Sequence, residues 1–274
     1  MRRSYSLTIN DRLIGSSNWD NPPQIKAVIS NIYGGSLVIA KIEIFNLSKN
    51  YRDGITDERE QTVKLKAEDC IVFSGKIVNA STQTPNRTDN VLELLCNSAP
   101  ESVNAKVAPK SYPKGTALKA VLKDILKPIN KNVLFRGLFN QKLGSSLTVS
   151  GDLERTLQNI GKMYNFTHKI NINDCVIIDN NYSDSAIIDL GLANEFLGGT
   201  TLTDAGCNIR CNLKPFIYPF NKVKVDALNP RLDYAGAYVR EVTVRQGIYK
   251  VISIVHSLDF YGAAWETELQ CVRT

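Results

Sequence analysis

Residues 249–274 read YKVISIVHSLDFYGAAWETELQCVRT, and apolar and polar side chains alternate over much of this stretch. Its last part sets a largely apolar row against a polar one: Trp265, Thr267, Leu269 and Cys271 against Glu266, Glu268 and Gln270. This alternation predicts strands with one buried face. A strand edge left open to water promotes aggregation. We therefore expect these strands to close a barrel.

The residues before this stretch extend the β pattern. Residues 207–214, CNIRCNLK, place four apolar side chains on one face: Cys207, Ile209, Cys211 and Leu213. The strand candidate NKVKVDAL (221–228) follows, and Gln246-Gly247 is a candidate hairpin turn. We predict a second tube-like β-barrel domain over residues 200–274.

The first hundred residues also read mostly as strands. SLVIAKIEIFNLS (36–48) alternates so that Val38, Ala40, Ile42 and Ile44 share one face. QTVKLKAEDCIVFSGKIVNAS (61–81) holds two short strands, and the second places Ile71, Phe73 and Ile77 on one side. We predict a first tube-like β-barrel domain over residues 1–99.

The middle of the chain carries helical periodicity. KGTALKAVLKDILKP (114–128) spaces five apolar residues on one helix face, with Thr116 as its predicted cap: Leu118, Val121, Leu122, Ile125 and Leu126. SGDLERTLQNIGKMYNF (150–166) repeats the pattern with Asp152 as its cap. Short strands flank the two helices, so we predict a small α/β middle module over residues 100–199. The expected fold class is mainly β with an α+β insert: two tube-type antiparallel β-barrel domains joined by this module.

The net charge and the cysteines limit the classes of function that the chain can have. The formal net charge is +6, and basic residues gather between Glu101 and Ser150. This pattern is typical of a solvated helix face, and the alternative is a surface for nucleic acid or an acidic partner. No run approaches the roughly 18 apolar residues that span a bilayer, so we expect no membrane insertion. The six cysteines are scattered along the chain, and in a reducing cytoplasm we expect them to be small, buried, apolar side chains.

No motif predicts catalysis. Cys207 and Cys211, four residues apart on a strand, would lie roughly 13 Å from each other, too far for a disulfide or a shared zinc. His168 and His256 lack a neighbouring nucleophile motif, and a pair formed by His256 and Asp259 would fix a turn.

Three further stretches are equally uninformative about chemistry. FLGGTT (196–201) lacks the residues of a phosphate-binding loop and reads as a turn or backbone crossing. The carboxylates Asp57, Glu58 and Glu60 have no catalytic partner elsewhere. KPFIYPFNKVKV (214–225) mixes basic and aromatic residues, as a surface that binds single-stranded nucleic acid would, but its two prolines favour a packed loop at the rim of a barrel. We predict no enzyme activity and no catalytic, cofactor-binding or metal-binding residues.

In their order along the chain, these pieces resemble the baseplate hub proteins of contractile-tailed bacteriophages, which are related to the hub part of type VI secretion spikes. The resemblance rests on IEIFNLSKNYRDGI (42–55), VKLKAEDCIVFSGKIVNAS (63–81), YPKGTALKAVLKDIL (112–126), SGDLERTLQNIGKMYNF (150–166), residues 198–225 and residues 249–271. It therefore covers nearly the whole chain.

The resemblance implies a structural virion component of the tail baseplate, assembled in the cytoplasm of the bacterial host. It implies a homotrimer whose six similar β-units form a pseudo-six-fold ring between the hexameric tail tube and the trimeric central spike. The implied partners are the tail tube protein, the central spike protein and other baseplate proteins, with phage DNA passing through the ring lumen without specific binding. Two alternatives stay open: a nucleic-acid-binding protein with OB-like barrels, and a tail-associated cell-wall hydrolase.

Overall fold

The computed structural model describes residues 3–32, 35–57, 61–84, 89–102, 104–190, 196–203, 206–225, 231–232 and 247–274. The chain divides into two compact units. The first unit contains residues 1–33, 39–96 and 183–274, and the second contains residues 34–38 and 97–182. The predicted three-part division into 1–99, 100–199 and 200–274 remains a proposal.

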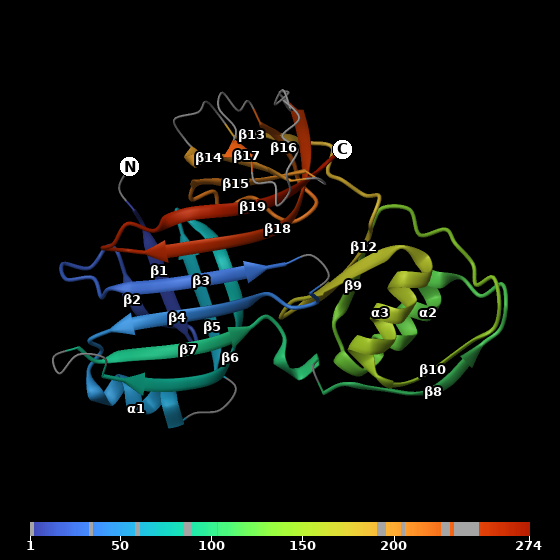
Figure 1. Ribbon diagram of the computed structural model, residues 1–274. Coiled ribbons are helices and arrows are strands. Elements are labelled where there is room, and N and C mark those ends of the chain that lie inside the picture. The colour runs from blue at the N-terminus through green and yellow to red at the C-terminus, as the bar shows by residue number, and fades with distance from the viewer. Residues whose placement is uncertain are drawn as a thin grey trace. The chain divides into compact units, whose positions relative to one another are not determined.

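The first unit is built on one hydrogen-bonded sheet (Figure 1). Its N-terminal elements are β1 (Tyr5–Ile9), β2 (Arg12–Ser16), β3 (Ile25–Asn31), β4 (Ile39–Phe45), α1 (Lys49–Asp57), β5 (Thr62–Ala67), β6 (Cys70–Gln83) and β7 (Val91–Asn97). Its C-terminal elements are β13 (Ile187–Asp189), β14 (Phe196–Thr203), β15 (Gly206–Asn212), β16 (Lys222–Val225), β17 (Arg231–Leu232), β18 (Gly247–Asp259) and β19 (Trp265–Arg273). The strand order is β17-β14-β15-β19-β18-β3-β4-β7-β6-β5-β1-β2, and β16 pairs with both β13 and β18.

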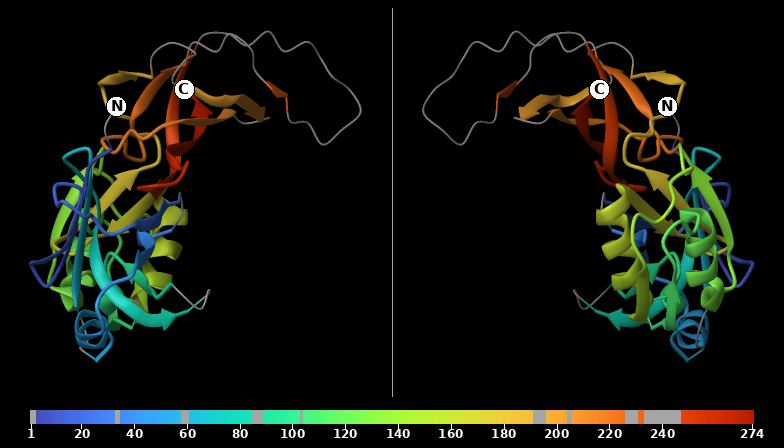
Figure 2. Two further views of the ribbon diagram at one scale, coloured as in Figure 1. Left: turned by 90° about the vertical axis from the view of Figure 1, so that its left-hand side faces the viewer. Right: turned by 90° about the vertical axis from the view of Figure 1, so that its right-hand side faces the viewer.

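The long strand β18 joins the two β parts of the sequence. Its first residues, Gly247 to Lys250, pair antiparallel with β16, and its last residues, Ile254 to Asp259, pair antiparallel with β3. Strand β19 runs beside β18 in every view (Figures 1 and 2). The N-terminal and C-terminal strands therefore share one sheet through a single thirteen-residue element.

The buried faces follow the alternation of the sequence. Ala40, Ile42 and Ile44 of β4 are fully buried, as predicted, and so are Leu7 of β1 and Leu65 of β5. In Figure 1, β1 and β5 cross behind β3 and β4, so the strand path folds back over these residues. The faces that alternate in sequence thus meet in one apolar interior.

One predicted face was wrong. Ile71 was expected to share a face with Phe73, but Ile71 is exposed and Phe73 is buried. The ladder between β5 and β6 shifts register between Leu65 and Lys66, which indicates a β-bulge. Because a bulge adds a residue to one strand, it moves the side chains beyond it to the other face. The predicted turn at Gln246-Gly247 cannot be followed, since Gln246 lies outside the described residues.

The second unit has a mixed α/β core. Its elements are η1 (Pro100–Ser102), β8 (Lys106–Tyr112), α2 (Leu118–Ile125), η2 (Lys127–Ile129), β9 (Asn132–Arg136), β10 (Leu147–Asp152), α3 (Leu153–Tyr164), β11 (Phe166–Ile170) and β12 (Asp174–Asp179). Strands β8 and β10 form one ribbon, and β11, β12 and β9 form a three-stranded sheet. The apolar faces of both helices pack into one cluster with residues of β8, β10, β11 and β12.

The two helices begin in different ways. Asp152 caps α3 as predicted, because its carboxylate accepts a hydrogen bond from the Arg155 amide at 3.1 Å. Thr116 does not cap α2: the preceding position is Ala117, and the Thr116 hydroxyl donates to the Pro113 carbonyl at 2.7 Å. The Thr116 hydroxyl therefore bonds to a carbonyl of the preceding turn and not to the helix amides that it was predicted to cap.

Candidate interaction surface

The two histidines are buried and paired with neighbours in the core. His168 on β11 lies 3.2 Å from the Glu154 carboxylate on α3. His256 on β18 lies 3.0 Å from the Thr267 hydroxyl on β19, and burial lowers its pKa to about 4. The expected pair of His256 with Asp259 does not form: Asp259 instead accepts from the Gly262 amide at 2.9 Å and pairs with Lys26.

The cysteines form no ligand set. Cys207 and Cys211 both point into the interior beneath β15, and Cys207 lies opposite Cys271 of β19. All six cysteines of the chain carry free thiols. Within the described ranges, no three acidic, histidine or cysteine side chains gather in a way that could hold a metal ion. Of the acidic segment singled out from the sequence, Glu58 and Glu60 lie outside the described residues.

The remaining two stretches lie in the C-terminal strands and their connection. FLGGTT was expected to be a turn or a backbone crossing, but it lies within β14, where the ladder to β15 shifts register between Phe196 and Thr200. The glycines therefore accompany a bulge. In the segment after β15, Ile217 and Phe220 are buried, whereas Phe216 and Tyr218 are 48% and 51% exposed.

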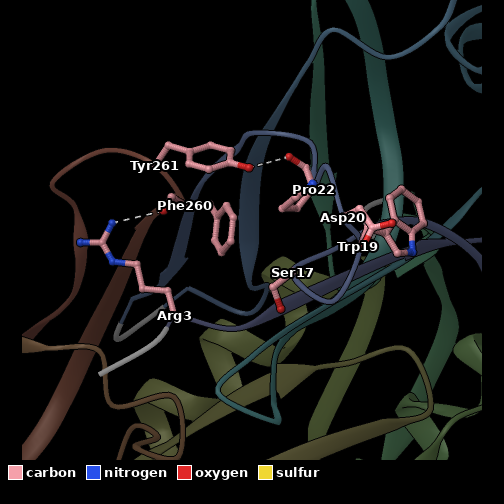
Figure 3. A pocket seen from close by; sticks show the side chains of 7 residues that line it. All are labelled: Arg3, Ser17, Trp19, Asp20, Pro22, Phe260 and Tyr261. Carbon is pink, nitrogen blue, oxygen red and sulfur yellow. Dashed lines mark hydrogen bonds between the residues drawn. The ribbon is translucent and has the colours of Figure 1, made fainter.

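A hollow of about 450 Å³ opens beside the turn between β18 and β19 (Figure 3). Three segments of the first unit line it: the N-terminal residue Arg3, the connection after β2, and the turn that follows β18. The lining side chains are those of Arg3, Ser17, Trp19, Asp20, Pro22, Phe260 and Tyr261. None of these residues was predicted as a site, since periodicity marks strands and helices and not the turns between them.

Arg3 holds the turn in place. Its guanidinium donates to the carbonyl oxygens of Asp259 at 2.8 Å and Ala263 at 3.1 Å, and also to that of Gly262. The same group lies 5.5 Å from the ring centroid of Trp265, within cation–π range. Arg3, the first described residue, thus ties the start of the chain to the hairpin of its last two strands.

Aromatic rings form the wall of the hollow. Phe260 packs edge-on against Tyr5 and Tyr261, with ring centroids 4.7 and 4.8 Å away. The Tyr261 hydroxyl donates to the Pro22 carbonyl at 2.9 Å, which joins the turn to the connection after β2. Trp19 and Tyr261 remain 42% and 60% exposed at the rim. Exposed aromatic residues held by such contacts are typical of protein–protein contact sites.

The chemistry of the hollow suits recognition. It offers a single carboxylate, that of Asp20, and two hydroxyls, that of Tyr261, which donates to Pro22, and that of Ser17, which accepts a hydrogen bond from the Tyr5 amide at 3.2 Å. No histidine or cysteine lines it among the described residues.

No protein-family model and no curated protein matches the sequence. Among solved structures, the fold is similar to the 43 kDa tail protein of prophage MuSo2 from Shewanella oneidensis, with a TM-score of 0.69, 9% identity, and coverage of 99% of this chain and 97% of that one. It is also similar to a tail protein from Neisseria meningitidis MC58, with a TM-score of 0.66, 11% identity, and coverage of 100% and 97%.

A third similar structure is the E. coli c3393 protein, described as a component of the type VI secretion system with structural similarity to the T4 bacteriophage tail proteins gp27 and gp5. Its TM-score is 0.64 at 10% identity, and the match covers 98% of this chain and 76% of that one. No helix among the described residues is long and apolar enough to cross a membrane. The predicted fold class is confirmed: the chain is mainly β with an α/β insert and has the fold of phage tail and type VI secretion proteins.

Proposed function

We propose that this chain is a structural component of a phage-type tail baseplate, a hub that assembles as a homotrimeric ring between the tail tube and the central spike. The observation that carries the proposal is the whole-length match to two tail proteins, which covers at least 97% of each chain. A shared fold alone does not fix function. Two features of this chain support the same conclusion.

The first feature is the coupling of the two β parts. Because β18 pairs with both β16 and β3, each copy of the chain carries two β regions on one sheet. Three copies therefore supply six such regions around a ring. This arithmetic supports an adaptor between a six-fold tube and a three-fold spike.

The second feature is the free edge at β2. Strand β2 is the last in the described strand path, and the residues that follow it, Ser17 to Pro22, lead directly into the hollow. A neighbouring copy that covers this edge would also cover Trp19 and Tyr261. We therefore place the hollow at the contact between subunits.

The test is the mass of the purified chain by native mass spectrometry, with negative-stain images of the same sample. We expect ring-shaped particles that contain three copies of this 30.4 kDa chain, either alone or together with the tube or spike protein. A chain that stays monomeric with both partners present would refute the proposal.

A pair of variants tests the place of the hollow. Trp19→Ala combined with Tyr261→Ala is expected to shift the trimer toward monomer, because aromatic anchors dominate interface energies. Phe216→Ala combined with Tyr218→Ala removes two equally exposed aromatics elsewhere in the unit and should leave the trimer intact. Equal effects of the two pairs would refute the placement.

A further inference from the structure

The excess positive charge of the chain lies in the second unit. Residues 34–38 and 97–182 contain twelve Lys and Arg against six Asp and Glu, whereas the rest of the chain contains 21 of each. With histidine neutral, the second unit thus accounts for the whole net charge of +6. The two units therefore present very different electrostatic surfaces to other molecules.

Helix α2 turns its cations outward. Its apolar face is fully buried, while Lys119 and Lys123 are exposed one turn apart on the opposite side. Like charges four residues apart destabilise a helix, and a cation in the first turn opposes the helix dipole. The first turn of α2 contains no acidic residue that would offset them. Lys119 is thus unfavourably placed and repels Lys123, although Lys123 itself lies in the last turn, where a cation suits the helix dipole.

The acid of α2 is already engaged. Asp124 accepts from Lys110 at 2.5 Å, from Lys127 at 2.8 Å and from the Tyr112 hydroxyl at 2.6 Å. These three donors leave Asp124 committed to the β8 side of the helix. Within the part of the chain that the structure describes, Lys119 and Lys123 have no carboxylate partner.

An ordered loop extends this surface with an apolar residue. Residues 137–142 leave β9 and return to the start of α2, where the Gln141 carbonyl accepts from the Leu118 amide at 3.0 Å. At the other end of the loop, Lys119 lies 5.6 Å from the ring centroid of Phe135. Between these anchors Leu138 is 76% exposed, with Arg136 and Lys142 also exposed on either side.

The geometry of the loop is held by its backbone. Gly137 has φ of +97°, and a Cβ at this position would lie 2.7 Å from the Cβ of Asp179. Phe139, next to Leu138, is buried and packs edge-on against Phe135 at 5.2 Å. Leu138 is therefore fixed outward by its neighbours.

We propose that Lys119, Lys123, Arg136, Leu138 and Lys142, here called the α2 basic surface, form a docking site for an acidic surface of a second tail protein. The cations pair with carboxylates of that protein, and Leu138 enters an apolar recess between them. The inference rests on the proposed function, because it takes the partner from the assembled tail.

The observations favour a protein over a nucleic acid. Binding to single strands uses aromatic faces for stacking, yet the aromatic ring at this surface, Phe135, lies beneath Lys119 and is partly buried. Phosphates offer nothing to a fixed, exposed leucine, whereas a protein surface can bury it. A polar rim around an apolar core is the usual arrangement of protein interfaces, and the cations here occupy the rim around Leu138.

The first test uses tails produced in the bacterial strain that encodes this chain. A photo-crosslinking amino acid replaces Leu138, and in a separate control it replaces Lys162, which is exposed on α3. We expect Leu138 to crosslink to an acidic segment of a different tail protein, mapped by mass spectrometry, and Lys162 not to give that product. A nuclease-sensitive product, a crosslink to another copy of this chain, or no product at position 138 would each overturn the proposal.

The second test reverses charge. Lys119→Glu combined with Lys123→Glu is expected to lower incorporation of the chain into tails at least tenfold, while the trimer formed by the purified chain, alone or with the tube or spike protein, is unchanged. Arg155→Glu combined with Lys162→Glu makes the same change in net charge on α3 and should change incorporation less than twofold. Equal incorporation of both pairs, with trimers intact, would overturn this inference and leave the proposed hub in place. A wild-type chain that forms no trimer and enters no tail would instead refute the proposed function itself.

Discussion

The buried lysine of the second unit gives a sharp prediction about stability and pH. Lys169 on β11 is only 8% exposed, and its ammonium donates to the Gly35 carbonyl. Burial lowers its pKa from 10.5 to about 8, although the charge of Glu154 acts in the opposite direction. Because the folded pKa is the lower one, the unfolded chain holds more protons between pH 8 and 10.5. Lys169 therefore contributes a rise in the free energy of unfolding with pH in that range, against the fall contributed by Cys175 and Tyr112, whose pKa values burial raises.

The size of the effect follows from the two pKa values. The difference between 10.5 and 8 corresponds to about 3 kcal/mol over the full range, and to about 2 kcal/mol between pH 7.5 and 9.5. Lys169→Met removes the titrating group, so its stability should lack this rise. At pH 7 the variant should be more stable than the wild type if losing the hydrogen bond to Gly35 costs less free energy than burying the charged ammonium group.

The assay is urea unfolding at a series of pH values, followed by ellipticity at 222 nm. This signal reports mainly on the second unit, because helices α2 and α3 belong to it, whereas α1 is the one α-helix described in the first unit. Lys162→Met, at an exposed position of α3, is the matched control and should keep the pH profile of the wild type. Parallel pH profiles of the wild type and Lys169→Met would refute the reasoning.

Three further variants test the core and the helices. The wild type should lose about 3 kcal/mol of unfolding free energy through His256 as pH falls from 6.5 to 4, because the folded pKa of about 4 lies below the unfolded one, and His256→Leu should not show this loss. Equal losses for the two proteins, measured from denaturant midpoints at each pH, would contradict the prediction. Asp152→Ala should cost about 1 kcal/mol by removing the cap of α3, while Asp152→Asn keeps most of it; a larger loss for the asparagine variant in urea melts would contradict the cap. Leu122→Ala should cost about 2–5 kcal/mol as a core cavity, against near-neutral change for Lys123→Ala; thermal unfolding with equal shifts would contradict the burial of α2.

The sequence by itself determined the local faces of this protein. The alternation at Cys207, Ile209 and Cys211 and the helical spacing of Leu118 and Leu122 all mark side chains that the structure buries. The cap at Asp152 was equally readable, because its partner amide is three residues away. These features depend on neighbours in the chain, so periodicity and short-range hydrogen bonding record them.

Reasoning from residue spacing failed where an extra residue or a competing hydrogen bond intervened. A bulge turned Ile71 outward, a turn carbonyl took the hydroxyl of Thr116, and the Gly-Gly segment of 196–201 became part of β14. None of these outcomes leaves a mark in the spacing of apolar residues. Each depends on which strand or carbonyl lies alongside.

Only the tertiary structure decided how the two β parts meet. Ile254 pairs with Asn31 in the ladder of β18 and β3, and Arg3 binds the turn after Asp259, although these residues stand at opposite ends of the sequence. The hollow between Trp19 and Tyr261 exists because of those contacts. A strand's pattern states which face will be buried but does not choose the edge that pairs with it, since any edge offers the same backbone donors and acceptors.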